Sequence, residues 1–246
     1  MGHRLPNVTG TCVRPSVSYR PASVDRENES VGSEHYFTAE PRATARATDV
    51  SFEVHGRSYH LRAAGGVFSA ERLDPGTAVL LRKGELPGPG TTGTLLDLGC
   101  GYGPIACVLA TVAPQASVYA VDVNTRALEL TRANAEALGV TVVAAEPDAV
   151  PADLVFDQIW SNPPIRVGKQ ELHALLRRWL PRLSPDGTAW MVVARHLGAD
   201  SLVPWLRDQG YLADRHASQQ GFRVLRVRPR ASGNSGDETP RDQENF

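Results

Sequence analysis

Two short segments carry residue types suited to chemistry on a nucleotide-like ligand. Residues 97–103 have the sequence Asp-Leu-Gly-Cys-Gly-Tyr-Gly, and residues 161–165 have the sequence Ser-Asn-Pro-Pro-Ile. Each segment follows a short apolar run, at 94–96 and 156–160, and the first leads into a helix-forming stretch. A strand, a glycine turn and a helix allow the backbone to approach a bound nucleotide, and open α/β sheets bind ligands at the carboxyl ends of their strands. The two segments together therefore predict one ligand site at such an edge.

The first segment combines three glycines with an acid. Gly99, Gly101 and Gly103 would suit any tight turn between a strand and a helix. Asp97 distinguishes the segment, because a purely structural turn does not need a carboxylate at its start. We therefore expect a turn that binds a cofactor.

A second acid, Asp122, ends the predicted strand at 117–121. A carboxylate at this position accepts hydrogen bonds from ribose hydroxyls and repels a 2′-phosphate. Capping of the following helix is the alternative role. Asn124 or Thr125 already serves that purpose, so we expect Asp122 to be free for a ligand.

The second segment is suited to the activation of a nitrogen nucleophile. An exocyclic or amide NH2 group is a poor nucleophile because its lone pair is delocalised. The side-chain oxygen of Asn162 and the carbonyl of Pro163 can accept its two N–H bonds, which localises and aims the lone pair, so positioning and desolvation supply the rate. Pro163 and Pro164 fix the backbone and remove competing donors. An ordinary Asn-Pro turn is the alternative, and the glycine segment upstream argues against it.

These segments resemble those of the class I S-adenosylmethionine-dependent methyltransferases. Within that superfamily the chain is similar to the methyltransferase small domain group, which includes ribosomal RNA guanine-N2 methyltransferases. The resemblance covers residues 34–230. The matching segments are 96–105, 120–124 and 160–169, with upstream stretches at 35–37, 66–69 and 73–77.

The resemblance implies S-adenosylmethionine as the cofactor and assigns roles to particular residues. In the family the first acid orients the amino-acid half of the cofactor, and an acid after the third strand lies near the adenine amino group. In this chain Asp148 matches the acid near the adenine amino group, and Glu146 and Asp153 are other candidates for that position. The alternative is that Asp148 is an ordinary carboxylate in a turn. The implied cofactor-binding residues are Asp97, Gly99, Gly101, Gly103, Asp122, Asp148 and Asn162, and the implied catalytic segment is Asn162, Pro163, Pro164 and Ile165.

Ile165 departs from the family's pattern. Relatives that methylate amines commonly carry Tyr or Phe at this position, where the ring stacks on the planar group of the substrate. The aromatic wall is therefore either absent or supplied by Phe68. Arg166 and Lys169 follow directly and are expected to contact substrate phosphates, with solvated loop charges as the alternative.

Elements that could position these residues alternate regularly from residue 94 onward. Alternating strands and helices predict a Rossmann-like, doubly wound α/β fold with a mostly parallel sheet covered on both faces. The last two strands have no helix between them, which predicts an antiparallel pair at the end of the sheet, as in the family's seven-stranded sheet. The expected strands are 94–98, 117–121, 140–145, 155–160, 187–194, 211–215 and 222–228, and the expected helices are 104–112, 125–138, 170–182 and 199–209.

A small β module is predicted before this domain. Apolar residues alternate on both sides of a turn at 55–57, which indicates a hairpin, and a short helix is expected at 77–81. The predicted organisation is a disordered extension at 1–33, the module and a linker at 34–93, the methyltransferase domain at 94–230 and a disordered acidic tail at 231–246.

Composition limits the classes of partner. The chain has 246 residues, 41% of them hydrophobic, which is enough for one substantial core. Its net charge of −1 provides no general attraction to polyanions, so any RNA contact needs a local basic patch. The three cysteines lack metal-ligand spacing, and neither a membrane-spanning run nor a secretory signal is present. We expect a cytoplasmic protein that binds no metal and no membrane.

The function that fits these observations is methyl transfer from S-adenosylmethionine to an exocyclic or amide nitrogen. Guanine N2 of ribosomal RNA is the expected target, with ribosomal RNA or a ribosomal subunit as the partner. A protein glutamine side chain presents the same N–H geometry and is the alternative substrate. A catalytically silent RNA-binding or ribosome-assembly protein would have lost Asp97, a glycine or Asn162, and all of them are present.

Overall fold

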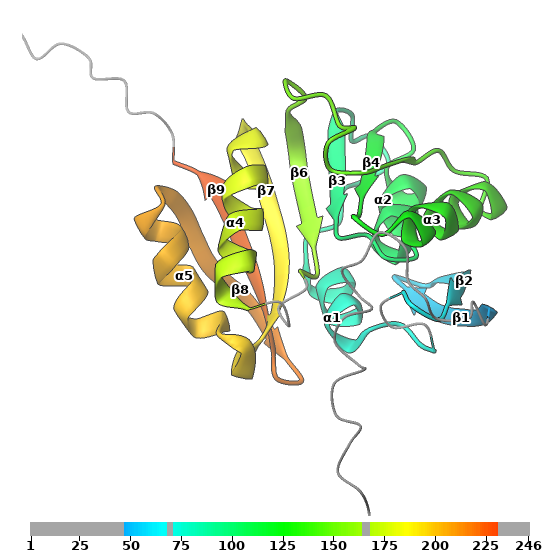
Figure 1. The fold of residues 1–246 in the computed structure, drawn as a ribbon, viewed down its shortest axis with the longest axis horizontal. Helices are drawn as coiled ribbons and strands as arrows, with labels where there is room; N and C mark the ends of the chain where they lie inside the picture. Colours follow the sequence, from blue (N-terminus) through cyan, green and yellow to red (C-terminus); the bar gives the residue numbers. More distant parts are fainter. Residues whose placement is uncertain (1–46, 68–70, 164–167, 231–246) are drawn as a thin grey trace, which may run out of the picture. The chain divides into compact units, whose positions relative to one another are not determined.

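A seven-stranded sheet organises the computed structural model of this chain, which describes residues 47–67, 71–163 and 168–230 (Figure 1). Neighbouring strands follow the order β5-β4-β3-β6-β7-β9-β8. Strands β3 to β7 pair in parallel, whereas β9 runs antiparallel to both β7 and β8, so the predicted antiparallel pair is confirmed. The strands are β3 (Thr94–Leu98), β4 (Ser117–Val121), β5 (Val143–Ala145), β6 (Phe156–Ser161), β7 (Leu183–Ala194), β8 (Tyr211–Gln219) and β9 (Phe222–Pro229).

The strand order reverses between β3 and β6. From β3 the chain proceeds outward through β4 to β5, and then returns to place β6 on the other side of β3. In open α/β sheets ligands bind at such a switch point, beyond the carboxyl ends of the strands. The glycine turn follows β3 and Asn162 follows β6, so the topology brings the two predicted segments to this place.

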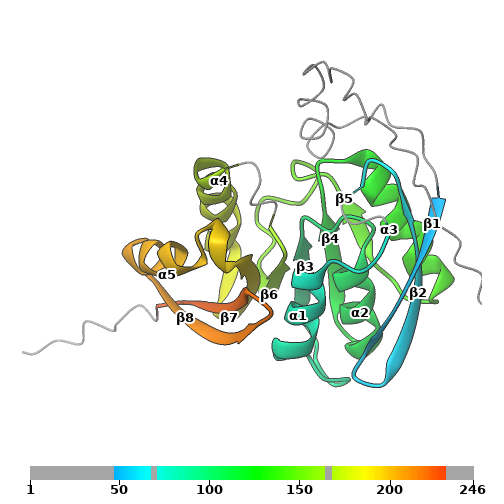
Figure 2. The same cartoon turned by 90° about the horizontal axis from the view of Figure 1, so that it is seen from below.

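Within the described residues, five α-helices cover the two faces of the sheet (Figure 2). Because successive strand side chains point to opposite faces, Leu95 packs in a cluster with α1, α2 and α3, whereas Leu96 packs in a cluster with α4 and α5. Trp190 and Met191 of β7 divide between the same two clusters. The helices are α1 (Pro75–Lys83), α2 (Pro104–Val112), α3 (Thr125–Ala137), α4 (Lys169–Trp179) and α5 (Ala199–Asp208).

The predicted N-terminal hairpin is present as β1 (Ala47–Val54) and β2 (Arg57–Ala64). His55 and Gly56 both have positive φ angles, 47° and 77°, which matches the turn type favoured by two-residue hairpins. The side chain of Asn134 on α3 accepts a hydrogen bond from the Arg62 backbone N–H and donates to the Arg62 carbonyl, both at 2.8 Å. These bonds satisfy part of the hairpin edge and attach it to α3.

Several element ends differ from the prediction. Strand β5 begins at Val143 instead of 140, because only Val143–Ala145 find ladder partners on β4. Strand β7 begins at Leu183 instead of 187, because its ladder with β6 passes through a register shift between Phe156 and Gln158. The predicted disordered ends, 1–33 and 231–246, lie outside the described residues, and the domain boundary at 93 stays a prediction.

Candidate active site

A pocket lies at the switch point between β3 and β6. About 330 Å³ of space within it is not filled by protein atoms, and part of this space is open solvent. Its walls combine the glycine turn, the residue after β6 and the N-terminal end of α1, which come from three separate parts of the chain. The lining residues are Asp74, Thr77, Gly99, Cys100, Gly101, Tyr102, Pro104, Ile105 and Asn162.

The glycine turn requires glycine for two different reasons. A Cβ atom on Gly103, where φ is +87°, would meet the Thr131 side chain at 2.8 Å, so this position has no room for a side chain. A Cβ atom on Gly101, where φ is +58°, would find its nearest neighbour, a Val67 methyl carbon, at 3.9 Å. The space in the Cβ direction of Gly101 is therefore open, and because Gly101 lines the pocket, a ligand there could approach its Cα closely.

Asp97 is fully buried beneath the turn and is not among the lining residues. Its Oδ2 accepts a hydrogen bond from the Ala106 backbone N–H at 2.9 Å, while its Oδ1 has no hydrogen-bond partner within the described ranges. Burial raises the pKa of Asp97 to about 8, and the negative charge of Asp122 adds to the rise, although the Ala106 N–H opposes it. A buried carboxylate with one unsatisfied oxygen is suited to receive a donor from a ligand.

Asp97→Asn should change how the stability of the ligand-free protein depends on pH. The pKa of Asp97 is raised from 3.8 to about 8 on folding, so the unfolded chain releases this proton first. The contribution of protonated Asp97 to folding stability is therefore complete below the unfolded-state pKa of 3.8, and it is lost as pH rises through the folded-state pKa of about 8. Between about pH 5 and pH 8 the wild-type melting temperature should fall by several degrees more than that of Asp97→Asn.

Thermal unfolding of ligand-free protein at the two pH values measures this effect. Asp186→Asn removes an exposed carboxylate and provides the control, which should retain the wild-type profile. Parallel pH profiles for wild type and Asp97→Asn would show that Asp97 does not titrate in this range.

Asp122 does not cap α3, as expected, but its carboxylate accepts two backbone hydrogen bonds that the sequence did not indicate. Its Oδ2 accepts from the Gly101 N–H and its Oδ1 accepts from the Asn124 N–H, both at 2.9 Å. These N–H groups belong to the glycine turn and to the residue before α3, and both reach the carboxylate where β4 ends. Asn124 is the helix cap, as expected, and accepts from the Arg126 N–H at 3.0 Å. Asp122 thus holds the glycine turn, and its remaining lone pairs stay available to a ribose hydroxyl.

Asn162 lies half-buried at the carboxyl end of β6. The hydroxyl of the preceding Ser161 donates to the Leu98 carbonyl at 2.7 Å, which fixes the end of β6 beside the end of β3. The side-chain nitrogen of Asn162 donates to Asp74 Oδ1 at 2.7 Å and to Thr77 Oγ1 at 3.0 Å. Pro163 is buried directly after it.

Asp74 and Thr77 were not predicted as functional residues. Asp74 is the N-cap of α1, and its Oδ1 also accepts from the Thr77 N–H at 3.0 Å. Tyr102 also lines the pocket and was not predicted as a site residue: its buried hydroxyl has no hydrogen-bond partner among the described residues, and burial together with the charge of Asp74 raises its pKa. The segment 73–77 was one of those that resemble the family, which was the only signal in the sequence for a role of α1.

Other predicted residues lie outside this pocket. The side chain of Asp148 is 94% exposed and forms an ion pair with Arg178 at 2.6 Å, so the structure does not bring it to the lining. Lys169 is the exposed first residue of α4. The remaining predicted site residues, Phe68, Pro164, Ile165 and Arg166, lie outside the described residues.

Arg182 and Arg226, two further arginines of the domain, make intramolecular contacts. Arg182 donates to the backbone carbonyls of Pro151 and Leu154, and its guanidinium lies 4.8 Å from the centroid of the Trp179 ring. Arg226 forms an ion pair with Asp214 at 3.3 Å. Within the described ranges no group of three or more His, Cys, Asp or Glu is placed to hold a metal ion, and no helix is long and apolar enough to cross a membrane.

Comparisons with known proteins agree with this geometry. The family model named methyltransferase small domain matches residues 58–226. The uncharacterized protein YbxB of Bacillus subtilis is 33% identical over 180 residues, which cover 72% of this chain and 89% of YbxB. The ribosomal RNA small subunit methyltransferase C of Pseudomonas aeruginosa is 35% identical over 178 residues, which cover 65% of this chain and 52% of that protein.

A solved structure of a ribosomal RNA methyltransferase also matches this chain. The T. thermophilus 16S rRNA N2 methyltransferase, in complex with AdoMet and guanosine, matches with a TM-score of 0.67 and 27% identity over 78% of this chain and 53% of that one. The chain therefore spans about half the length of the two ribosomal RNA methyltransferases that it matches. The predicted fold that binds S-adenosylmethionine is confirmed, and this chain belongs to the methyltransferase small domain family.

Proposed function

We propose that this protein transfers a methyl group from S-adenosylmethionine to the N2 amine of guanine in ribosomal RNA. The observation that carries the proposal is the hydrogen bonding of the Asn162 side chain. Its amide nitrogen is occupied by Asp74 and Thr77, which leaves its amide oxygen to accept from a nucleophile in the pocket that the glycine turn also lines. Two relatives with matching domains carry ribosomal RNA methylation in their names, and one was solved with guanosine.

The residues present fit S-adenosylmethionine. The open backbone at Gly101 allows close approach, the unsatisfied Oδ1 of Asp97 can accept from an amino group, and Asp122 retains lone pairs for a ribose hydroxyl. When bound, this cofactor supplies an electrophilic methyl group. We assign its amino-acid half to the side of the pocket near Asp97 and its ribose to the side near Asp122.

Asn162 and Pro163 would then prepare the nucleophile. The Asn162 amide oxygen and the Pro163 carbonyl accept the two N–H bonds of the amine, which localises the lone pair on nitrogen and directs it toward the methyl donor. The nitrogen becomes acidic once it is alkylated, so the proton can leave to solvent without a strong base. Guanine N2 and a glutamine amide both meet these requirements, and the aliphatic Ile165 is the observation that favours glutamine as a second candidate.

Transfer of tritium from labelled S-adenosylmethionine decides between the candidates. Ribosomal RNA, whole ribosomal subunits and a protein extract would be tested in parallel, each prepared from cells that lack this protein. We expect the label in RNA. Label in protein alone would replace the RNA proposal with the glutamine alternative.

The strength of RNA binding should depend on salt through local cations near Asn162. Arg166 and Lys169 follow Asn162 closely in the chain, and removing a cation that neutralises one phosphate should reduce the slope of log K against log salt by about one. The double variant Arg166→Ala/Lys169→Ala should therefore show a shallower slope than the wild type in RNA-binding titrations.

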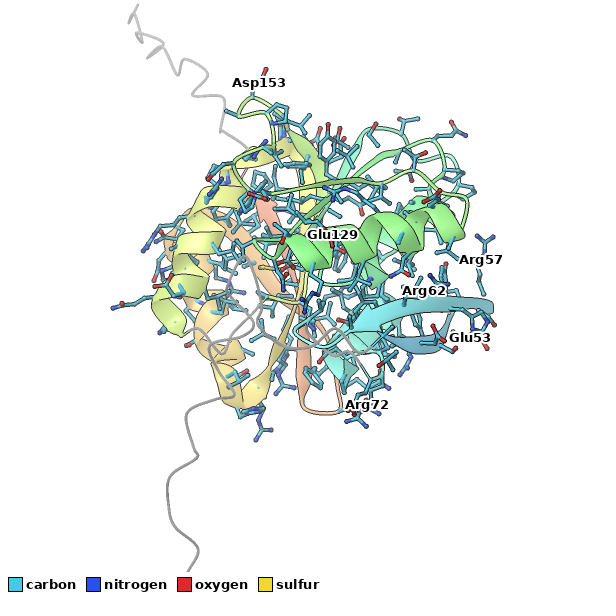
Figure 3. All side chains as sticks on the ribbon, turned by 45° about the vertical axis from the view of Figure 1, so that its right-hand side comes forward. Glu53, Arg57, Arg62, Arg72, Glu129 and Asp153 are labelled. Atoms are coloured by element: carbon cyan, nitrogen blue, oxygen red, sulfur yellow. The ribbon has the colours of Figure 1, made fainter. Side chains whose placement is uncertain are left out.

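The hairpin offers a control of equal charge. Arg57 and Arg62 are exposed on β2 (Figure 3) and belong to no wall of the pocket. The double variant Arg57→Ala/Arg62→Ala should retain the wild-type slope. Equal slopes for the wild type and Arg166→Ala/Lys169→Ala would show that these two residues do not bind RNA phosphates.

A further inference from the structure

The N-terminal end of α1 holds the reactive asparagine in one orientation. We infer that Asp74 and Thr77 are positioning residues, which fix the amide of Asn162 so that its oxygen, and never its nitrogen, faces the nucleophile. The inference rests on the proposed nitrogen methylation and deepens it. It gives the segment before the glycine turn a part in the reaction.

Both hydrogens of the Asn162 side-chain nitrogen are used in hydrogen bonds to α1 and its N-cap. Asn162 Nδ2 carries two hydrogens, and it has two acceptors, Asp74 Oδ1 at 2.7 Å and Thr77 Oγ1 at 3.0 Å. Thr77 is buried and Asp74 is half-buried, so solvent competes weakly for these bonds. We call this arrangement the Asp74–Thr77 clamp.

The charge on Asp74 determines which way the amide faces. A carboxylate can only accept hydrogen bonds, so the NH2 group must face it. The reversed amide would place its oxygen 2.7 Å from a carboxylate oxygen, where two acceptors repel each other. An asparagine without such a neighbour could present either its amide oxygen or its amide nitrogen to the pocket. If the nitrogen faced the substrate amine, two N–H donors would face each other and no hydrogen bond could form.

The clamp is itself held rigidly. Asp74 Oδ1 also accepts from the Thr77 backbone N–H, so capping of α1 and orientation of Asn162 use the same oxygen atom. A Cβ atom on Gly76 would meet this oxygen at 2.9 Å and the Phe222 ring at 3.1 Å, so α1 packs closely here. Val79, Leu80 and Leu81 then anchor the helix in the core, each with no exposed surface.

Two substitutions separate the clamp from the helix cap. Ser is a strong N-cap residue but is one carbon shorter than Asp, so Asp74→Ser should retain the cap and no longer reach Asn162. Thr77→Val removes the hydroxyl at nearly constant shape, whereas Thr77→Ser retains it. We expect kcat to fall about tenfold or more for Asp74→Ser and by less for Thr77→Val, with Thr77→Ser close to wild type. Cofactor affinity should change little in all three, and the melting temperature should fall by no more than a few degrees in Asp74→Ser and Thr77→Val, because the helix cap is retained.

A double-substitution cycle tests whether the clamp acts through Asn162. In the Asn162→Ala background, Asp74→Ser should cause no further decrease in kcat, because nothing remains to be oriented. An equal further decrease in that background would mean that Asp74 supports the fold or another step, and the inference would be wrong. Wild-type kcat in Asp74→Ser would overturn it as well.

A measurement without substrate keeps this test separate from that of the proposed function. In ¹H–¹⁵N spectra, the side-chain NH2 signals of Asn162 are identified by their disappearance in Asn162→Ala. We expect them to exchange slowly with water in the wild type and to move toward the positions of free amides in Asp74→Ser. Signals unaffected by Asp74→Ser would overturn the clamp. If the wild type methylates no RNA, the proposed function fails, and these spectra still decide the orientation of Asn162.

Discussion

Asn162→Ala should lower the rate of methyl transfer by on the order of 10²-fold or more, because it removes an oriented acceptor that the reaction needs as charge develops on the nitrogen. The pocket wall would retain its other members, since the glycine turn is held by Asp122 and the end of β6 is held by Ser161. Cofactor affinity should therefore change much less than the rate.

Single-turnover transfer and calorimetry with the demethylated cofactor measure the two quantities separately. Gln209→Ala removes an exposed amide after α5, outside the pocket wall, and should leave both unchanged. Undiminished transfer by Asn162→Ala would exclude nitrogen methylation at this motif.

Gly101→Arg should abolish binding of S-adenosylmethionine. The Cβ direction at Gly101 leads into space where the nearest atom lies 3.9 Å away, so a long side chain there would fill the room that a ligand needs. Gly101→Ala is the matched control. It introduces the same unfavourable positive φ, at a cost of about 1–2 kcal/mol, but fills little of the pocket.

Calorimetry should show no binding for Gly101→Arg and a smaller decrease in affinity for Gly101→Ala. Wild-type affinity in Gly101→Arg would place the cofactor elsewhere. A wild-type protein that binds NAD, but neither S-adenosylmethionine nor its demethylated product, would retain the fold and contradict the function. Gly103→Ala is unsuitable for this test, because its Cβ would meet Thr131 at 2.8 Å and disturb the turn itself.

The sequence predicted most elements because local signals and tertiary packing agree in this chain. The glycine turn lies between a buried strand and an apolar helix, and the alternation of strands and helices indicated the mostly parallel sheet. Element ends were less predictable. The early start of β7 depends on a register shift against β6, which the turn-like residues Ser184 to Gly187 did not indicate.

The sequence predicted a site residue only where its neighbours in the chain indicate its role, and it did not predict contacts between distant segments. Asn162 is identified by its neighbouring prolines, but its partner Asp74 lies 88 residues away and has the local pattern of an ordinary helix cap. Asp122 was expected to be free because its sequence neighbours include another cap. Its bond to the Gly101 N–H crosses 21 residues, and no pattern within one element indicates it.

We propose that this protein methylates guanine N2 through Asn162, and the position of the transferred methyl group tests this proposal most directly. Ribosomal RNA from cells that lack the protein would be labelled by the wild type and by Asn162→Ala, digested to nucleosides and analysed by mass spectrometry. We predict that the wild type yields N2-methylguanosine and that the variant yields at most about one hundredth as much. Label on a carbon or an oxygen of the nucleoside, or label found only in protein as N5-methylglutamine, would contradict the claim.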